Sequence, residues 1–318
     1  MTDIPLYPTF MKIEPLEKGW SSENKYQIET ADGKQLLLRI AHINCYKRKK
    51  SEYEMIRKAA ALGVPVSEPI DFGLCNGGEN VYTLLTWVEG SDVESVLPEC
   101  TETEQYIWGM KAGALLQKLH AIPAPETAKP WNIWLEDRIQ RQINFYHANS
   151  IKSDHGDMII RFLKENQILT DNRPQTYNHG DYSVSNLITM PNGEIGVIDF
   201  NFFGSNKGCG DPWWEFCAVA WESELSPYFH TGMIRGYFGG EPPQEFFVII
   251  SYYFAYSALS ALCATVRDEE GNPEDGRRHV ENILRWFDNM QNPVPTWYLK
   301  DFHVQWTDGM PYKLKEPL

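Results

Sequence analysis

The sequence lacks an excess of basic residues. Its 318 residues include 29 Lys and Arg against 43 Asp and Glu, which gives a net charge of −14 at pH 7. Nucleic acids and anionic membrane surfaces attract proteins of the opposite sign, so we expect neither as a partner. The acidic balance suits a cationic small molecule instead. Nothing in the sequence indicates an oligomeric state.

The six cysteines lack the spacing of a metal site or a redox pair. None of them belongs to a Cys-x-x-Cys motif. Free thiols in a reducing compartment are the simplest interpretation. The first ten residues, MTDIPLYPTF, also lack the basic and apolar stretches of a secretory signal. We therefore expect a cytoplasmic protein.

One uncharged run is long enough to cross a bilayer, but it lacks the other features of a membrane span. Residues 246–266 contain no charge, and a membrane helix needs about 20 such residues. The run nevertheless contains seven Ser, Thr and Tyr residues, and Glu241 and Glu245 precede it where a Lys/Arg cluster would be typical. We expect a buried helix of a large helical part.

The densest group of functional signals lies in residues 178–200, NHGDYSVSNLITMPNGEIGVIDF. Asn192-Gly193 predicts a tight hairpin, because both residues tolerate the positive φ of a type I′ turn. With these two residues as the loop, the numbers of paired residues sum to 385, so Asn186 faces Asp199. Opposed side chains have Cβ atoms roughly 4.5–5.5 Å apart.

This pairing predicts a metal site beside a base. An amide oxygen on Asn186 and a carboxylate on Asp199 can share one hard cation, and Mg²⁺ prefers such ligands together with water and phosphates. Asp181 lies in the loop just before the hairpin. An ionised carboxylate there can accept the proton of a hydroxyl group.

The ordered set His179-Gly180-Asp181, Asn186 and Asp199, followed by Gly-Asp-Pro at 210–212, resembles the aminoglycoside phosphotransferase and choline kinase family of small-molecule kinases. The resemblance implies Asp181 as the catalytic base and Asn186 and Asp199 as Mg²⁺ ligands. It implies ATP or GTP as the phosphate donor. His179 is more simply explained as a residue that holds the catalytic loop through hydrogen bonds.

The resemblance also implies an α+β, protein-kinase-like fold with two lobes. We expect a nucleotide-binding lobe at residues 1–88, with an antiparallel sheet and one helix, and a mainly helical catalytic lobe at 89–318. The hinge is expected at about 86–92. Thr86 to Val88 would then offer backbone groups to the nucleotide base.

Within the first lobe, Arg39 matches the position at which kinases place the strand lysine that contacts the α- and β-phosphates. An inward charge among aliphatic neighbours needs a partner. Glu52 is expected to supply it from the buried face of the following helix, with Glu54 as the second choice. A hairpin around Asp32-Gly33, read with the same turn type, places Tyr26 opposite Arg39.

The phosphate-covering loop has only a weak signature. Gly19-Trp-Ser21-Ser22 forms a short polar turn that can cover phosphates through backbone N–H groups and the hydroxyls of Ser21 and Ser22, and a plain turn explains it equally well.

The second lobe contains clearer local signals. Thr101-x-x-Glu104 is a capping box that predicts a helix to about Leu119. Asp211-Pro212 predicts a helix start with Asp as the cap, and Glu215 is expected to be structural. Acidic residues at 222–224 and 268–270 would suit an amine-bearing ligand.

We therefore expect an Mg²⁺-dependent enzyme that transfers the γ-phosphate of ATP or GTP to a hydroxyl of a small, cationic molecule such as an aminoglycoside. An antibiotic-resistance enzyme and a metabolic kinase for amino alcohols or sugars remain alternatives. A nucleotide-binding module without catalysis is another, although it need not keep all of Asp181, Asn186 and Asp199. A metal-dependent hydrolase would need further His or Asp ligands, and a protein kinase would need an Ala-Pro-Glu motif.

Overall fold

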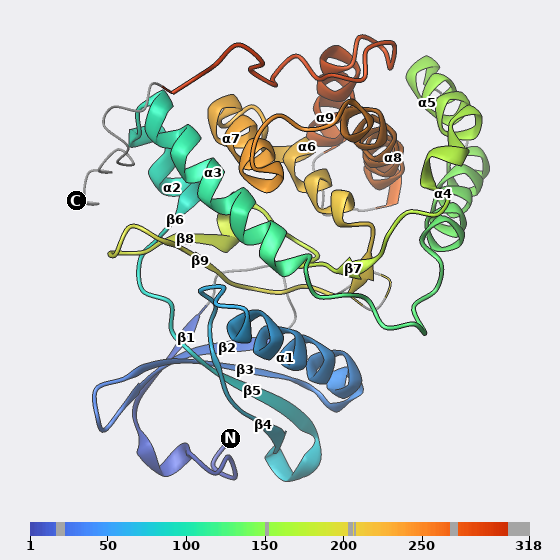
Figure 1. Ribbon diagram of the computed structural model, residues 1–318. Coiled ribbons are helices and arrows are strands. Elements are labelled where there is room, and N and C mark those ends of the chain that lie inside the picture. The colour runs from blue at the N-terminus through green and yellow to red at the C-terminus, as the bar shows by residue number, and fades with distance from the viewer. Residues whose placement is uncertain (17–22, 150–152, 203–205, 207, 268–272, 305–318) are drawn as a thin grey trace.

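The structure is a computed structural model, and it describes residues 1–16, 23–149, 153–202, 206, 208–267 and 273–304. Figure 1 shows two parts, a sheet with one helix below and a larger group of helices above. The expected antiparallel sheet with one helix, followed by a mainly helical part, is confirmed.

The first part is a five-stranded antiparallel sheet in the order β1-β2-β3-β5-β4. Alternation along β3 directs Leu36, Leu38 and Ile40 into the core on one face of the sheet. Arg39 lies between them and points to the other face, which α1 covers (Figure 1). The elements are β1 (Phe10–Leu16), β2 (Asn24–Thr30), β3 (Gln35–His42), α1 (Tyr46–Ala61), β4 (Pro69–Cys75) and β5 (Asn80–Thr86).

The hairpin between β2 and β3 has a different register from the predicted one. Thr30 N–H donates to the Lys34 carbonyl at 3.0 Å, and Gly33 N–H donates to the Thr30 carbonyl at 2.9 Å, so the loop has three residues. Only Gly33 in this loop has a positive φ, 78°. This geometry is a type I turn followed by a glycine bulge. The prediction that Tyr26 faces Arg39 is wrong, and Lys25 takes that place.

The hairpin around Asn192-Gly193 departs from its predicted register in the same way. It joins β8 (Leu187–Thr189) to β9 (Ile195–Val197), and Met190 N–H donates to the Glu194 carbonyl at 2.9 Å. Gly193 has a φ of 77°, whereas Asn192 has no positive φ. Paired residue numbers therefore sum to 384, as in Leu187 and Val197. A slip of one residue moves side chains to the opposite face of a strand.

The second part is mainly helical. The predicted capping box is present, with the Thr101 side chain and Glu104 each accepting from the other's backbone. Close approach of α3 and α7 requires glycine, because a Cβ on Gly113 would lie 1.9 Å from the Met233 carbonyl oxygen. The helices are α2 (Val93–Val96), α3 (Glu102–Leu119), α4 (Trp131–Ala148), α5 (Asp154–Glu165), α6 (Val219–Glu222), α7 (Pro227–Phe238), α8 (Gln244–Arg267) and α9 (Pro273–Trp286).

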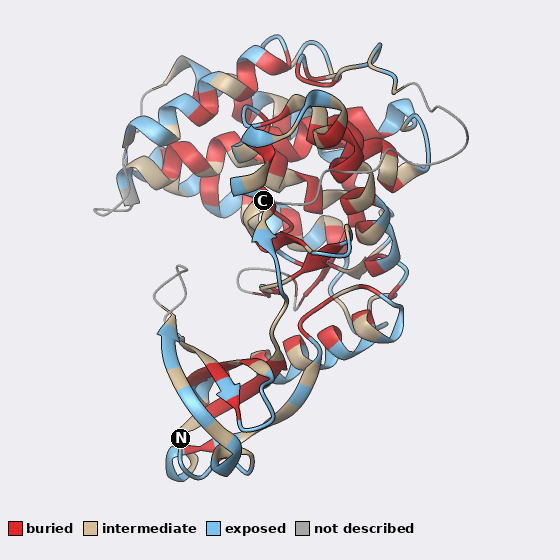
Figure 2. Cartoon of the chain, turned by 90° about the vertical axis from the view of Figure 1, so that its left-hand side faces the viewer, coloured by how far each residue is buried: buried red, intermediate tan, exposed pale blue. Residues whose placement is uncertain are grey.

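The uncharged run forms α8, which lies in the core of the helical part. Among the described residues it is the one helix long and apolar enough to cross a membrane, and 83% of that window is buried inside the protein. In Figure 2, buried residues gather inside the helical part, and exposed residues lie along its outer surface. The expectation of a buried core helix is confirmed.

Short strands lie between the five-stranded sheet and the helices (Figure 1). β6 (Ser91–Asp92) pairs with β8 at the edge of a three-stranded sheet, and β7 (Thr176–Tyr177) pairs with β10 (Cys209–Gly210). Val197 N–H donates to the Pro65 carbonyl, just after α1, at 2.7 Å. This bond ties β9 to the first part, so that the segment after β9 lies next to β3.

Candidate active site

Asp181 lies exposed in the loop between β7 and β8. Its carboxylate accepts a hydrogen bond from Asn186 Nδ2 at 3.0 Å, and its backbone carbonyl accepts one from the same nitrogen at 2.9 Å. Asn186 is buried at 9% exposure, so the amide is a fixed donor. The carboxylate is held in one place while it stays open to solvent, as a general base requires.

His179 holds this loop, as expected. The ring is fully buried, its Nδ1 accepts from Asp181 N–H at 3.3 Å, and its Nε2 lies 2.8 Å from the Ile198 carbonyl. With Nδ1 as an acceptor, Nε2 carries the proton and donates to that carbonyl. Burial lowers the pKa of His179, which favours this neutral form.

Glu215 holds the loop around His179 and Gly180 through the backbone. Its carboxylate accepts from His179 N–H at 2.6 Å and from Gly180 N–H at 3.0 Å. It is buried, and no cation of the described residues pairs with it, so burial raises the pKa of Glu215 to about 7, although the two N–H groups oppose the shift. Gly180 adopts a φ of 87°, where a Cβ would meet the Asn201 carbonyl. The expected structural role of Glu215 is confirmed.

Asp211 caps the next helical segment, as predicted. It precedes a 3₁₀ helix at Pro212–Ala218 that leads into α6, and its carboxylate accepts from Trp213 N–H at 2.8 Å. Arg173 and Tyr253 also bond this carboxylate, which is fully buried. Asp211 is therefore committed to the fold of the helical part.

Asn186 and Asp199 are not cross-strand partners, which corrects the predicted register. Ile198 N–H donates to the Asn186 carbonyl at 3.0 Å, so Ile198 takes the position expected for Asp199. Asp199 follows the strand ladder with a φ of 59°, an uncommon conformation for a residue other than glycine. Such conformations cluster at functional sites, where the surrounding structure maintains them.

Asp199 is held by two cations from the first part. Arg39 Nη1 lies 2.7 Å from Oδ1, and Lys25 Nζ lies 3.1 Å from Oδ2. Burial alone would raise the pKa of Asp199, but Arg39 and Lys25 outweigh it and lower the pKa to about 2. The carboxylate is thus ionised and lies at the junction of the two parts. Lys25 was not among the predicted site residues.

Arg39 is buried and paired, but Glu52 is not the partner it binds. Arg39 Nε donates to Glu23 Oε2 at 3.0 Å. Glu52 is buried on the expected face of α1, where its carboxylate forms an ion pair with Lys49, one turn earlier. Lys49 also lies 2.5 Å from Glu23 Oε1. Glu23, Lys49 and Glu52 therefore form a buried chain of charges behind Arg39.

The second choice for this partner, Glu54, is wrong as well. It is exposed and pairs with Arg57 at 3.3 Å. Glu23 comes from the segment before β2, and its pairing with Arg39 spans 16 residues that only the hairpin brings together. No local helix pattern points to it.

The backbone N–H groups expected near the nucleotide differ in whether they are already bonded. Thr86 N–H donates to the Glu68 carbonyl at 2.9 Å, and Trp87 N–H donates to the Gln35 carbonyl at 3.1 Å, so neither group is free for a base. Val88 N–H has no backbone partner among the described residues. Ser21 and Ser22 lie outside the described residues.

The donor set of Asn186 and Asp199 fits a hard cation. Asn186 Nδ2 is committed to Asp181, which directs its amide oxygen elsewhere, and Asp199 supplies an ionised carboxylate. Amide and carboxylate oxygens suit Mg²⁺, which takes its remaining ligands from water and phosphates. The described residues contain no group of three or more His, Cys, Asp or Glu able to hold a metal ion. The carboxylate cluster of a two-metal hydrolase is therefore not found among them.

Glu222 also contacts the loop that carries Asp181. The Glu222 carboxylate accepts from Val184 N–H at 3.1 and 3.2 Å. Burial, with the nearby charges of Asp181 and Glu94, raises the pKa of Glu222 to about 8. Glu224 is paired with Arg285 at 2.7 Å, and residues 268–270 lie outside the described residues. Of the two described members of the acidic groups noted in the sequence, Glu222 is the one near the base.

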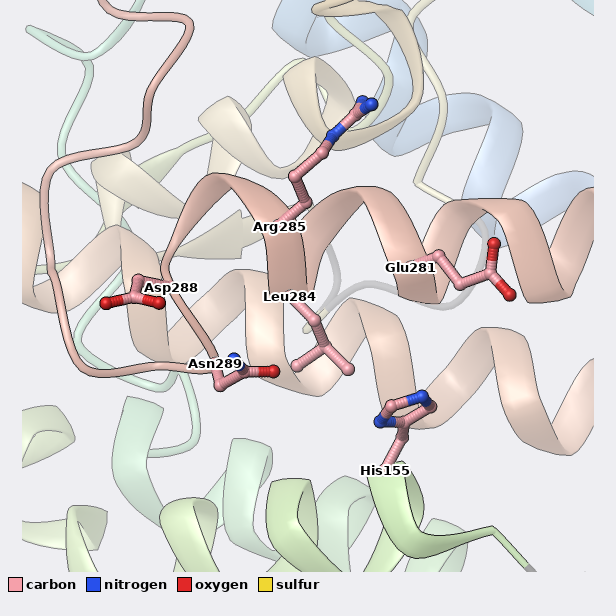
Figure 3. A pocket seen from close by; sticks show the side chains of 6 residues that line it. All are labelled: His155, Glu281, Leu284, Arg285, Asp288 and Asn289. Atoms are coloured by element: carbon pink, nitrogen blue, oxygen red, sulfur yellow. The ribbon is translucent and has the colours of Figure 1, made fainter.

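Two hollows on the described surface lie away from these residues. One, of about 380 Å³, separates the start of α5 from the end of α9, and its carboxylates Glu281 and Asp288 point apart in Figure 3. The other, of about 490 Å³, lies between α1 and Tyr177. Neither contains a residue of the Asp181 and Asp199 site.

Known proteins share both the sequence pattern and the fold. The pattern of the phosphotransferase enzyme family (APH) matches residues 12–247. No curated protein matches the sequence significantly. A choline/ethanolamine kinase family protein from Mesorhizobium loti is similar in structure, with a TM-score of 0.63 and 16% identity, over 92% of this chain and 95% of that one.

Two further solved structures are similar. Wild-type aminoglycoside 2'-phosphotransferase-IIIa in its GDP complex has a TM-score of 0.62 and 12% identity, over 86% of this chain and 92% of that one. Amicoumacin kinase hAmiN, in complex with AMP-PNP, Ca²⁺ and Ami, has a TM-score of 0.58 and 14% identity, over 89% and 90%. At these identities the likeness establishes the protein-kinase-like two-lobed fold.

Proposed function

The chain belongs to the phosphotransferase enzyme family, and we propose that it is an Mg²⁺-dependent kinase that phosphorylates a hydroxyl group of a small, amine-bearing molecule. One observation carries the proposal. The exposed Asp181 carboxylate is fixed by Asn186, and the ionised Asp199 lies just beyond the same hairpin, paired with Arg39 of the nucleotide-binding lobe.

The donor is ATP or GTP. Arg39 contacts the phosphates as the guanidinium counterpart of the kinase strand lysine, and the buried chain of Glu23, Lys49 and Glu52 fixes its position. Val88 N–H is the backbone donor that the hinge can offer to the base. Asn186 and Asp199 would hold Mg²⁺, which neutralises phosphate charge when it is bound.

Asp181 performs the proton chemistry. It orients the acceptor hydroxyl, whose oxygen forms a bond to the γ-phosphorus while the bond from that phosphorus to the β,γ-bridging oxygen breaks. The nucleoside diphosphate leaves with that electron pair, and the hydroxyl proton passes to the Asp181 carboxylate. Phosphoryl transfer depends mainly on positioning and electrostatics, so few polar groups suffice.

The acceptor carries an amine. The Asp181 carboxylate is exposed at the catalytic loop, and the chain has a net charge of −14, which favours a cationic acceptor. The similar structures include kinases named for choline or ethanolamine and for aminoglycosides. We propose the shared chemistry, an alcohol with a nearby cationic amine, which includes antibiotics and metabolic amino alcohols.

The test is a transfer assay. The protein is incubated with Mg²⁺ and ATP or GTP against aminoglycosides, macrolides, sugars and amino alcohols, and diphosphate release and acceptor mass are measured. Acceptor-dependent release with an added phosphate on one class supports the proposal. Nucleotide binding without transfer to any acceptor would favour the non-catalytic module.

A further inference from the structure

Lys25 is a second cation at the site, and it shares Asp199 with Arg39. The two residues are direct cross-strand partners on β2 and β3. Each takes a different oxygen of the carboxylate, Lys25 Nζ at 3.1 Å and Arg39 Nη1 at 2.7 Å. The Lys25 side chain is only 12% exposed. It is therefore an inward cation rather than a solvated strand residue.

The two cations differ in what else holds them. Arg39 keeps a second partner, Glu23, when it leaves Asp199. Among the described residues, the Lys25 ammonium has Asp199 as its single acidic partner. A largely buried ammonium without a partner is costly. The described residues offer Lys25 no other acidic partner when Asp199 is taken by another cation, so a newly bound anion would stabilise its ammonium.

We propose that Lys25 is a second phosphate-binding residue beside Arg39, and that Lys25 and the divalent metal exchange with each other at Asp199. The inference rests on the proposed function. Asp199 would help to hold a divalent ion, whose charge would repel both cations and compete with them for the carboxylate. The anions that can receive them are the nucleotide phosphates, for which an ammonium is a common ligand.

This exchange has an unusual consequence for binding. Lys25 attracts phosphates and competes with the metal, so removal of its charge has opposite effects on the two ligands. A purely structural Lys25 would instead leave the affinity for metal-free nucleotide unchanged.

The experiment compares wild type with Lys25→Met. Calorimetry with metal-free ADP and GDP measures phosphate attraction, and electron paramagnetic resonance with Mn²⁺ alone measures metal affinity. We expect nucleotide affinity to fall about tenfold, as for loss of one charge-assisted hydrogen bond. We expect Mn²⁺ to bind more tightly, by about threefold to tenfold. Lys25→Arg should restore nucleotide affinity.

The matched control is Lys12→Met, an exposed lysine on β1 paired with Glu14. It should change neither affinity. Unchanged affinities in Lys25→Met, or shifts of both in the same direction, would overturn the proposal. A wild type that binds nucleotide but phosphorylates no acceptor would count against the proposed function and leave this inference standing.

A measurement on the wild-type protein avoids any folding defect of the variant. Acetylation of Lys25, followed by mass spectrometry, reports whether its ammonium is paired. Labelling should rise when Mn²⁺ is added and fall when metal-free ADP or GDP is added. Labelling that neither ligand changes would contradict the exchange.

Discussion

Asn186 donates its side-chain Nδ2 to the Asp181 carboxylate at 3.0 Å and to the Asp181 carbonyl at 2.9 Å. The two bonds fix both the amide and the carboxylate. The nitrogen of Asn186 is committed to the base, so its oxygen is the atom left for a metal. One side chain thereby links the base to the proposed metal site.

Asp181→Asn should remove catalysis and preserve binding. The amide oxygen of the new side chain can still accept from Asn186, but it cannot take a proton at neutral pH. We expect kcat to fall at least about a hundredfold, the usual contribution of a general base. Calorimetric affinity for Mg-nucleotide should stay within a factor of about two. A variant with wild-type kcat would remove Asp181 from the mechanism.

Asp199→Ala should abolish metal-dependent nucleotide binding. It removes the one carboxylate of the proposed metal site and leaves Lys25 and Arg39 without that partner. We expect Mg²⁺ to stop increasing nucleotide affinity, measured by calorimetry with and without the metal. Asp301→Ala, at an exposed position near the end of the described chain, is the control. An unaltered Mg²⁺ effect in Asp199→Ala would refute the metal role.

Glu215→Gln should loosen the catalytic loop. The glutamate accepts two backbone N–H groups with its two oxygens, and glutamine would turn an N–H₂ group towards one of these donors. We expect a loss of about 1–3 kcal/mol in the free energy of unfolding. We also expect a larger fall in kcat than rise in KM. Glu245→Gln, on the exposed start of α8, is the matched control and should change neither.

The raised pKa of Glu222 predicts a pH dependence of stability. The folded protein holds this proton up to about pH 8, whereas an unfolded chain releases it near 4.5. Between these values the unfolded state binds fewer protons, so stability falls as pH rises. The side chain is partly exposed, so the slope should stay below about 1 kcal/mol per pH unit.

Denaturant titrations of wild type and Glu222→Gln across this range measure the effect. The variant, which keeps an oxygen for Val184 N–H, should gain stability relative to wild type as pH rises. A difference between the two proteins that is constant with pH would show that the Glu222 pKa is not raised.

The glycine bulge of the β8–β9 hairpin predicts a local energetic cost. A Cβ on Gly193 would meet no atom within 4 Å, so only its φ of 77° opposes substitution. Gly193→Ala should cost about 1 kcal/mol in the free energy of unfolding. Gly240→Ala, with equal space and no positive φ, should cost less. Equal costs in thermal or urea unfolding would contradict the turn assignment.

Local signals in the sequence predicted local structure well. The capping box of Thr101, the cap of Asp211 and the burial of α8 depend on a few neighbouring residues, and all three are confirmed. The buried face of α1 was also predicted, because helical periodicity placed Glu52 with apolar neighbours.

The predictions that failed depended on register and on distant contacts. Pro191 precedes Asn192-Gly193 and favours the second position of a type I turn, which lengthens the loop by one residue. The same three-residue loop around Asp32-Gly33 replaces Tyr26 with Lys25 opposite Arg39. A slip of one residue thus concealed a cation of the site. Glu23 was missed because no periodicity links it to Arg39.

The most direct test of the account is a crystal structure of the protein with Mg²⁺ and a non-hydrolysable ATP or GTP analogue. We predict that Asn186 Oδ1 and an Asp199 oxygen both lie about 2.0–2.1 Å from one ion. Lys25 and Arg39 should then have left Asp199 for the phosphates. An ion that contacts neither residue, with Asp199 still held by the two cations, would contradict it.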